Sequence, residues 1–382
     1  LPAHLLTNNP YAVMLLTLLG FNLISTVYAF LLGRLVADVR VGLLAALLFT
    51  FSEISVSGSY TAWAQLLLPG FFLMTAYYLL RWCLHNSGRD LALCGIVATF
   101  AFMTHFSAVL LYAALLVVAL LVRPRWHLGW LFAGAAVCTL LLAPYTLFQL
   151  ERDVVDLRAF FTQEPTLDAN ILDEYAYLQY GAPEPLTAAP DPARQSDSAQ
   201  PATADSAPAP SIIVRLLRFA ASIPAQIISA TTIGYDFTPR ALQVSAPLLA
   251  FMLHLIMLSL YAAFILGCIT IVWRAWRAKA IRSQPALLLL AFLLVIVAGL
   301  MLTGTAPWEN ATYYAGIIGL QWVIASVALN LLLSHRGARF VLIALLAAYV
   351  LLHSAERVER IRQHDDTAYS NYNVWLYRHI NA

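Results

Sequence analysis

The long apolar runs of this chain constrain its fold more than any other feature. Nine such runs occur in the 382 residues, separated by short polar or charged segments and by one long polar region. A helix needs roughly 20 apolar residues to cross a bilayer core of about 30 Å, and most of the runs have about that length. The runs are 11–32, 39–56, 62–84, 91–122, 128–148, 247–273, 285–302, 312–333 and 338–353. We therefore predict an all-α, multi-pass membrane protein.

The composition supports this prediction and excludes other classes. Hydrophobic residues make up 61% of the chain and charged residues only 11%, whereas soluble domains carry roughly a quarter charged residues. The formal net charge is +2. A charge this small offers no basic surface that could hold a nucleic-acid backbone, so nucleic acid is excluded as a partner and the lipid bilayer is expected.

The run 91–122 is too long for one ordinary crossing, and a polar stretch around His105 interrupts it. Five short loops are rich in arginine: 34–40, 81–89, 123–127, 274–282 and 335–339. Short cytoplasmic loops are enriched in Lys and Arg. All five loops fall on one face of the membrane only if 91–122 folds into a hairpin of two short helices that turns near His105. We therefore expect about ten transmembrane helices, including this hairpin.

The chain divides into four regions by composition. Membrane helices occupy 1–148 and 246–353, a large loop occupies 149–245, and a tail follows from 354 to 382. The loop contains twelve acidic residues and six arginines, so we place it, with the tail, on the extracytoplasmic face. Within it, 181–210 is dominated by Ala, Pro, Ser, Asp and Gln and is predicted to be a disordered insertion. The amphipathic segment 212–228 is predicted to be an interfacial helix.

Candidate site residues are polar groups that a membrane protein would otherwise avoid, and they gather at the predicted extracytoplasmic rim. His105 and Arg152 are cationic candidates for binding a phosphate. A hydrogen-bonded turn residue and a self-paired charge cluster are the ordinary structural interpretations of these two. The candidates for binding the rest of a substrate are Glu53, Tyr60, Trp63, Gln65, Asp236, Arg240, Trp308, Glu309, Tyr313 and Tyr314. A polar turn and an interfacial aromatic belt are the structural alternatives for this set.

Metal-ligand spacings, phosphate-binding glycine loops and Ser/His/Asp arrays do not occur in the sequence. We therefore predict no metal site and no cofactor, and leave open whether a divalent metal is needed. The arginine-rich loops are too short to form a nucleotide-binding domain. A donor substrate is therefore expected to reach the protein through the lipid.

The segment 28–74 contains Leu32-Gly33-Arg34-Leu35, then Arg40 to Leu48, a serine-rich turn, Tyr60 and Trp63. With these features it resembles the GT-C superfamily of polyprenyl-phosphate-sugar glycosyltransferases. Phe102-Met103-Thr104-His105-Phe106 is similar to the hairpin turn of that family. Within that superfamily the resemblance is to the bacterial relatives of protein O-mannosyltransferases and of the lipid A aminoarabinose transferase. The resemblance covers about residues 10–150 closely and the rest by topology.

The resemblance implies an inverting enzyme of the cytoplasmic membrane, acting at its extracytoplasmic face in the bacterial cell envelope. It would move a sugar from a polyprenyl phosphate to an acceptor that is a glycan, a lipid or a protein. The family's catalytic carboxylate lies in a first loop that would precede Leu1, so no catalytic residue is assigned and the sequence is expected to be N-terminally truncated. The family's basic residue near the turn at Tyr60 is absent here, which leaves His105 and Arg152 as phosphate contacts.

Two other classes fit the sequence less well. A transporter or lipid flippase usually has charged or broken-helix features near the middle of the membrane, whereas the polar residues here gather at one rim. A catalytically inactive assembly subunit is the third interpretation, and the residues alone do not separate it from the enzyme.

Overall fold

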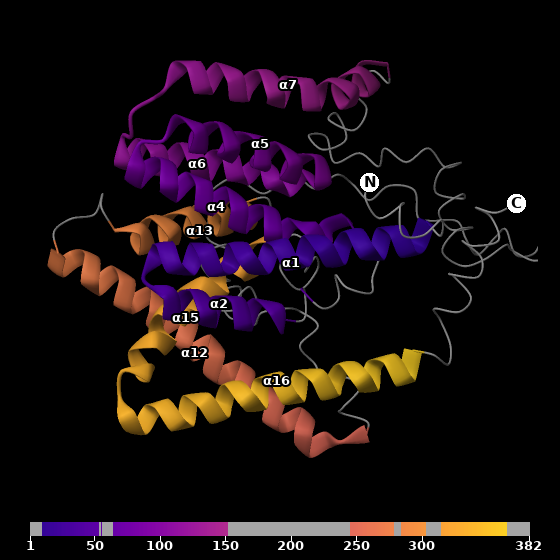
Figure 1. The fold of residues 1–382 in the computed structure, drawn as a ribbon, viewed down its shortest axis with the longest axis vertical. Helices are drawn as coiled ribbons and strands as arrows, with labels where there is room; N and C mark the ends of the chain where they lie inside the picture. The colour runs from indigo at the N-terminus through magenta and orange to yellow at the C-terminus, as the bar shows by residue number, and fades with distance from the viewer. Residues whose placement is uncertain are drawn as a thin grey trace, which may run out of the picture. The chain divides into compact units, whose positions relative to one another are not determined.

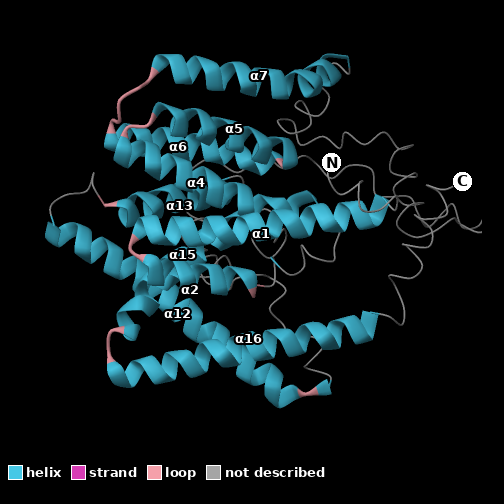
Figure 2. Ribbon diagram, in the orientation of Figure 1, coloured by secondary structure: helices cyan, strands magenta, loops and turns pink. Residues whose placement is uncertain are grey.

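A computed structural model describes residues 10–52, 55, 64–151, 245–278, 284–302 and 315–364 of the chain. In these residues it contains ten α-helices, three short 3₁₀ helices and no strand (Figure 2). The α-helices are α1 (Pro10–Val36), α2 (Val39–Thr50), α4 (Leu68–His85), α5 (Gly88–Thr104), α6 (Val109–Val122), α7 (Leu128–Glu151), α12 (Pro247–Ala278), α13 (Pro285–Leu302), α15 (Ile318–Leu333) and α16 (Arg336–His364).

The helices have the lengths and compositions of membrane spans. Four of them contain apolar stretches long enough to cross a bilayer, namely Leu15–Val36, Leu128–Phe148, Pro247–Ala278 and Arg336–Glu356. Shorter apolar helices accompany them. Because hydrocarbon cannot hydrogen-bond to the backbone, a helix, which satisfies its own backbone groups, is the natural spanning element for such runs. The predicted all-α, multi-pass membrane fold is therefore confirmed.

By its internal contacts the chain divides into two units, Leu1–Leu142 with Ser222–Gln363, and Ala143–Ala221 with His364–Ala382. Of the second unit, the structure describes only residues 143–151 and His364. The packing described below belongs to the first unit.

The four arginine-rich turns that the structure describes in the first unit, and the facing ends of α12 and α13, lie at the same end of its helices (Figure 1). We call this the basic end: it comprises the turns between α1 and α2, α4 and α5, α6 and α7, and α15 and α16, together with the facing ends of α12 and α13. This arrangement requires the chain to turn back between α5 and α6. The predicted hairpin is therefore confirmed, with its turn at His105.

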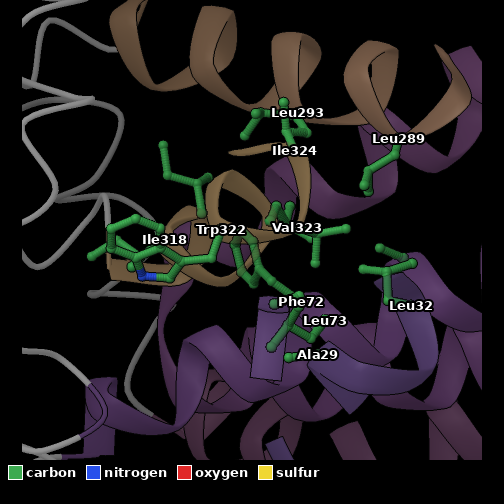
Figure 3. Packing of buried hydrophobic residues seen from close by; sticks show 14 of the residues in the cluster. Ala29, Leu32, Phe72, Leu73, Leu289, Leu293, Ile318, Trp322, Val323 and Ile324 are labelled. Atoms are coloured by element: carbon green, nitrogen blue, oxygen red, sulfur yellow. The ribbon is translucent and has the colours of Figure 1, made fainter. Parts of the chain in front are cut away.

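Helix α15 is the core of the first unit (Figure 3). Every residue from Ile318 to Leu329 is buried, and the helix packs against α1, α2, α4 and α12. The approach to α12 is close, because a side chain at Gly267 would overlap the carbonyl oxygen of Ile324. Small residues at such crossings let membrane helices come together at short range. Helix α15 therefore forms the packed centre against which the other helices of the first unit are arranged.

Two helix ends differ from the sequence prediction. Helix α2, which begins the run predicted to span 39–56, ends at Thr50, because the amide of Ser52 turns to the carbonyl of Phe49 at 3.0 Å and the Ser52 hydroxyl donates to the same oxygen at 2.7 Å. Conversely, α16 does not stop at His353, where the apolar run ends, but continues to His364. Glu, Arg and Gln are good helix formers, so a polar sequence need not end a helix.

Most of the predicted loop and tail fall outside the described residues. These include the insertion 181–210, the interfacial helix 212–228 and the chain after His364.

Candidate functional site

The structure describes the position and contacts of one predicted site residue, His105. Gln65 lies in the 3₁₀ helix Ala64–Leu67 that precedes α4, but its side chain is not described. The remaining predicted residues lie outside the described part of the chain: Glu53, Tyr60, Trp63, Arg152, Asp236, Arg240, Trp308, Glu309, Tyr313 and Tyr314. Whether they meet at one site therefore stays a prediction.

His105 forms the break between the two arms of the hairpin. Its backbone is extended, with φ −160° and ψ 134°, and its amide donates to the carbonyl of Ala101 at 3.0 Å to close α5. Its ring nitrogen Nδ1 accepts from the amide of Ser107 at 3.2 Å, which caps the 3₁₀ turn Phe106–Ala108. The expectation of a hydrogen-bonded turn residue is therefore confirmed at this position.

These contacts also determine the form of the imidazole. Because Nδ1 accepts a hydrogen bond from a backbone amide, it carries no proton, and the ring proton is on Nε2. The Ser107 hydroxyl, 2.7 Å from Nδ1, then donates to the same nitrogen. Partial burial lowers the pKa of His105 below its usual value, which favours the same neutral form. His105 can thus present a single Nε2–H donor, rather than a positive charge, to a phosphate oxygen.

A second polar group links α1 to the chain that follows α2. The side-chain amide of Asn22 donates to the carbonyl oxygen of Ser55 at 2.9 Å, and both residues are buried. The Thr26 and Thr50 hydroxyls lie 3.2 Å apart on the same pair of helices. The serine-rich segment that the sequence singled out is thus anchored to α1 at Ser55, away from the basic end.

The sequence analysis missed two buried ionisable residues on α16. His353 is 1% exposed and Glu356 is 2% exposed. They lie three residues apart, so they share one face of the helix. The prediction ended the apolar run at His353 and assigned Glu356 to an extracytoplasmic tail. A helical reading of 349–356 would have placed Tyr349, His353 and Glu356 on one face, and that is the signal in the sequence.

Tyr349 begins this polar face and joins it to two other helices. Its hydroxyl donates to the carbonyl oxygen of Leu48 at 3.1 Å, near the end of α2. Its ring lies 4.6 Å from that of His353 and 6.3 Å from that of Trp322 on α15, both edge-on. Tyr349 and Trp322 are fully buried. His353 therefore packs against Tyr349, which in turn packs against Trp322 of α15.

A groove of about 290 Å³ opens between α4, α5, α6 and the first half of α7. Its lining includes Trp82, Cys94, Tyr112, Trp126 and Cys138 and is almost wholly apolar. Such a lining accommodates hydrocarbon but offers no charged group for catalysis. Among the described residues, no group of three His, Cys, Asp or Glu side chains is arranged to hold a metal ion.

These features define a multi-pass, all-helical membrane protein whose described polar site residues lie away from its basic end. The family model for dolichyl-phosphate-mannose-protein mannosyltransferase matches residues 2–148. The matched part covers less than half of the chain; it includes helices α1 to α6 and His105, and it ends before α12. No curated protein and no solved structure gives a significant match.

Proposed function

We propose that this protein is a membrane glycosyltransferase that moves a sugar from a polyprenyl-phosphate donor to an extracytoplasmic acceptor. The observation that carries the proposal is the family match over residues 2–148. The donor in that family's description is a sugar on a lipid phosphate. A donor held in the bilayer also suits a chain made largely of apolar helices.

The arginines support the proposed orientation. Positively charged short loops favour the cytoplasmic side, so the basic end would face the cytoplasm. His105, Ser55, His353 and Glu356 would then lie toward the extracytoplasmic face, in the cytoplasmic membrane of a cell-envelope protein. A lipid-linked sugar in the outer leaflet would have its phosphate at this depth.

The proposed reaction is a single displacement at the anomeric carbon of the sugar. An acceptor hydroxyl forms the new bond to that carbon, the bond to the phosphate oxygen breaks, and its electron pair remains on the lipid phosphate. A carboxylate takes the hydroxyl proton. In this proposal His105, through Nε2–H, and Arg152, through its guanidinium fork, stabilise the negative charge on the departing phosphate.

The test is release of polyprenyl phosphate by the native full-length protein in lipid nanodiscs. A panel of polyprenyl-phosphate sugars, beginning with mannose, is supplied with a membrane and periplasmic extract as the source of glycan, lipid and protein acceptors. We expect enzyme-dependent release with one donor and a matching mass increase in one acceptor class. Release of polyprenyl phosphate from none of the donors would contradict the proposal. Repeating the assay with EDTA decides whether a divalent metal is needed.

The transporter and the inactive subunit remain the alternative functions. A transporter would move a labelled lipid or solute between the two faces of a vesicle without breaking a covalent bond, so flux without release would favour it. Neither flux nor release would favour the inactive subunit. In the described part of the spans, the ionisable pair of α16 lies at the end of its span rather than at its middle, which favours chemistry on one face.

A further inference from the structure

The apolar groove between α4, α5, α6 and α7 lies in the half of these helices that is nearest the basic end (Figure 1). Its lining includes Trp82, close to the last residue of α4, and Leu91, close to the first residue of α5. It continues along residues 112–119 of α6 and 131–138 of α7. Each of these two runs rises about 10 Å, which is most of one leaflet of a bilayer core of about 30 Å. The groove therefore extends from the basic end into the adjacent leaflet.

The groove has a buried floor and an exposed rim. On the floor, Trp82 is 2% exposed and Cys94 is 1% exposed, whereas Leu116 and Trp126 on the rim are 55% and 50% exposed. The groove is thus open to the surroundings of the helices, which in a membrane are the acyl chains of lipids. A bound water needs several polar partners, and the lining offers almost none. Its chemistry therefore selects a hydrocarbon chain.

The first half of α7 is held close to α5 by backbone contacts. A side chain at Gly134 of α7 would begin 3.0 Å from the Cα atom of Ala92. One at Gly88 of α5 would begin 2.5 Å from the ring of Trp130. The distance between the two helices is therefore fixed on this side, and the groove remains open beside the contact.

The mouth of the groove carries an excess of positive charge. Between positions 81 and 130 the sequence has one acidic residue, Asp90, and four arginines: Arg81, Arg89, Arg123 and Arg125. Asp90 pairs with Arg81 at 3.2 Å. The other three arginines are exposed, and no described residue forms an ion pair with them. The charge at this end of the groove therefore calls for an anion.

Two of these arginines belong to a turn that is fixed to the groove. The amide of Arg123 donates to the carbonyl of Ala119, a lining residue, at 2.7 Å. The carbonyl of Arg125 accepts from the indole N–H of Trp82 at 3.3 Å. The ring of Trp126, the next residue, lies edge-on to that of Trp82 at 5.1 Å. Because these contacts hold the backbone of the turn, both guanidinium groups are tethered at the groove mouth.

We propose that the groove binds one anionic phospholipid of the leaflet at the basic end, with an acyl chain along α6 and α7 and its phosphate at Arg123 and Arg125. Basic pockets between membrane helices bind acidic lipid headgroups, and a guanidinium binds phosphate oxygens bidentately. A neutral lipid would fill the groove but leave the arginines without a counterion. The inference does not rest on the proposed function, because the groove lies at the opposite end of α5 from His105.

The test is native mass spectrometry of the delipidated full-length protein in detergent. Phosphatidylglycerol and phosphatidylcholine with the same palmitoyl and oleoyl chains are titrated separately, so only the headgroup differs. Each arginine near an anionic headgroup contributes about fivefold in affinity. We therefore expect the wild type to bind the first phosphatidylglycerol about 30-fold more tightly than phosphatidylcholine. Equal binding of the two lipids would overturn the inference.

Two arginine variants test the headgroup contacts. Arg123→Gln and Arg125→Gln should each weaken phosphatidylglycerol binding about fivefold and leave phosphatidylcholine binding unchanged. Both substitutions keep the backbone hydrogen bonds of the turn, so the fold is preserved. The matched control is Arg336→Gln, an exposed arginine at the basic end that does not border the groove; it should bind both lipids like the wild type. Wild-type affinity in both turn variants, or an equal loss in the control, would contradict the assigned phosphate site.

A matched pair on α7 tests the chain site. Ala135 lines the groove and its exposed neighbour Ala136 does not. Ala135→Phe should fill the groove and lower affinity for both lipids about tenfold, while Ala136→Phe should have no effect; Ala135→Leu replaces the first variant if it does not fold. Equal affinities in the two variants would exclude the groove as the chain site.

A phosphatidylglycerol with a photoreactive acyl chain then locates the lipid in nanodiscs. We expect crosslinks on residues 112–119 and 131–138, and crosslinks confined to other helices would overturn the inference. Polyprenyl phosphate is added as a competitor. If it displaces phosphatidylglycerol at lower concentration than phosphatidylglycerol itself does, the groove serves the donor lipid and the inference is wrong. None of these measurements needs turnover, so a protein that releases no polyprenyl phosphate contradicts the proposed function alone.

Discussion

The hydroxyl of Tyr349 donates a hydrogen bond to the carbonyl oxygen of Leu48 across 301 positions of the chain, at 3.1 Å. The last carbonyl groups of any helix lack partners within the helix. Tyr349 supplies one for α2, whose end lies inside the protein. This single contact ties the last helix of the described chain to one of the first.

Replacing Tyr349 by Phe should destabilise the protein while leaving its packing nearly unchanged. The Leu48 carbonyl would lose its partner in a buried site, and hydrogen bonds between membrane helices are worth about 0.6 kcal/mol on average and up to about 1.7. We expect a loss of about 1 kcal/mol, seen as a lower melting temperature in detergent. The control is Tyr261→Phe, which removes the hydroxyl of a half-buried tyrosine on α12. Equal melting temperatures for Tyr349→Phe and the wild type would contradict the assigned contact.

The N-cap of α2, Asp38, makes the stability of the folded protein depend on pH in the acid range. The carboxylate of Asp38 accepts from the amides of Arg40 at 2.8 Å and Val41 at 3.0 Å, and from the side-chain amide of Asn330 at 3.1 Å. The bond from the Val41 amide is the main cause that lowers the pKa of Asp38. A lowered folded pKa means that the carboxylate stabilises the protein above the ordinary Asp pKa. That contribution is lost as the pH falls through the folded value.

Asp38→Ala should therefore cost about 1 kcal/mol at neutral pH, the usual value of an N-cap. The difference between wild type and variant should shrink below about pH 4, where Asp is protonated in the unfolded chain. Melting temperatures measured from pH 7 down to pH 3 check this. A gap between the two proteins that stays constant over this range would argue against a charged cap.

The close crossing of α12 and α15 predicts a strong effect of a small substitution. A methyl group at Gly267 would overlap the backbone of Ile324, which cannot move aside like a flexible side chain. Gly267→Ala should cost about 2 kcal/mol, as overpacking of a core does. Gly20→Ala is the matched control, because nothing lies within 4 Å of a methyl group there. The control should be neutral or slightly stabilising, since Ala is the better helix former. If Gly267→Ala melts at the same temperature as Gly20→Ala or higher, the close crossing of α12 and α15 is disproved.

His105 combines a structural cap with the proposed phosphate contact, and asparagine separates the two. An Asn side chain can accept from the Ser107 amide, as Nδ1 does now, and Asn is a favoured capping residue. It has no donor at the position of Nε2. We expect His105→Asn to melt like the wild type but to transfer sugar about 100-fold more slowly, the usual loss when one charge-stabilising donor is removed.

Ser107→Ala provides the complementary control for His105. It removes the hydroxyl that donates to Nδ1 and leaves Nε2 in place, so it should affect stability more than rate. The rates are measured with subsaturating donor, to report transition-state stabilisation. Wild-type rates in His105→Asn would leave His105 with the cap alone and make Arg152 the principal phosphate candidate.

The element types and the hairpin could be predicted from the sequence for a simple physical reason. Long apolar runs have few alternatives to helices in hydrocarbon. Because arginine-rich loops favour one face of the membrane, the chain must cross an even number of times between one such loop and the next. These two local signals are enough to divide 91–122 at His105, where the structure places the turn. The capping role of His105 likewise depends only on neighbouring residues.

Tertiary structure decided which helix is central and which polar groups are buried. Hydropathy does not distinguish α15, which is buried on all sides over Ile318–Leu329, from α7, which is mostly exposed, because lipid and protein interior are equally apolar. The Leu48 carbonyl near the end of α2 has its hydrogen-bond partner in Tyr349, 301 positions away, and His353 and Glu356 are buried by packing that their local sequence does not reveal. The local sequence determines whether a segment enters the membrane as a helix. Only tertiary packing determines whether each of its side chains then faces lipid or protein.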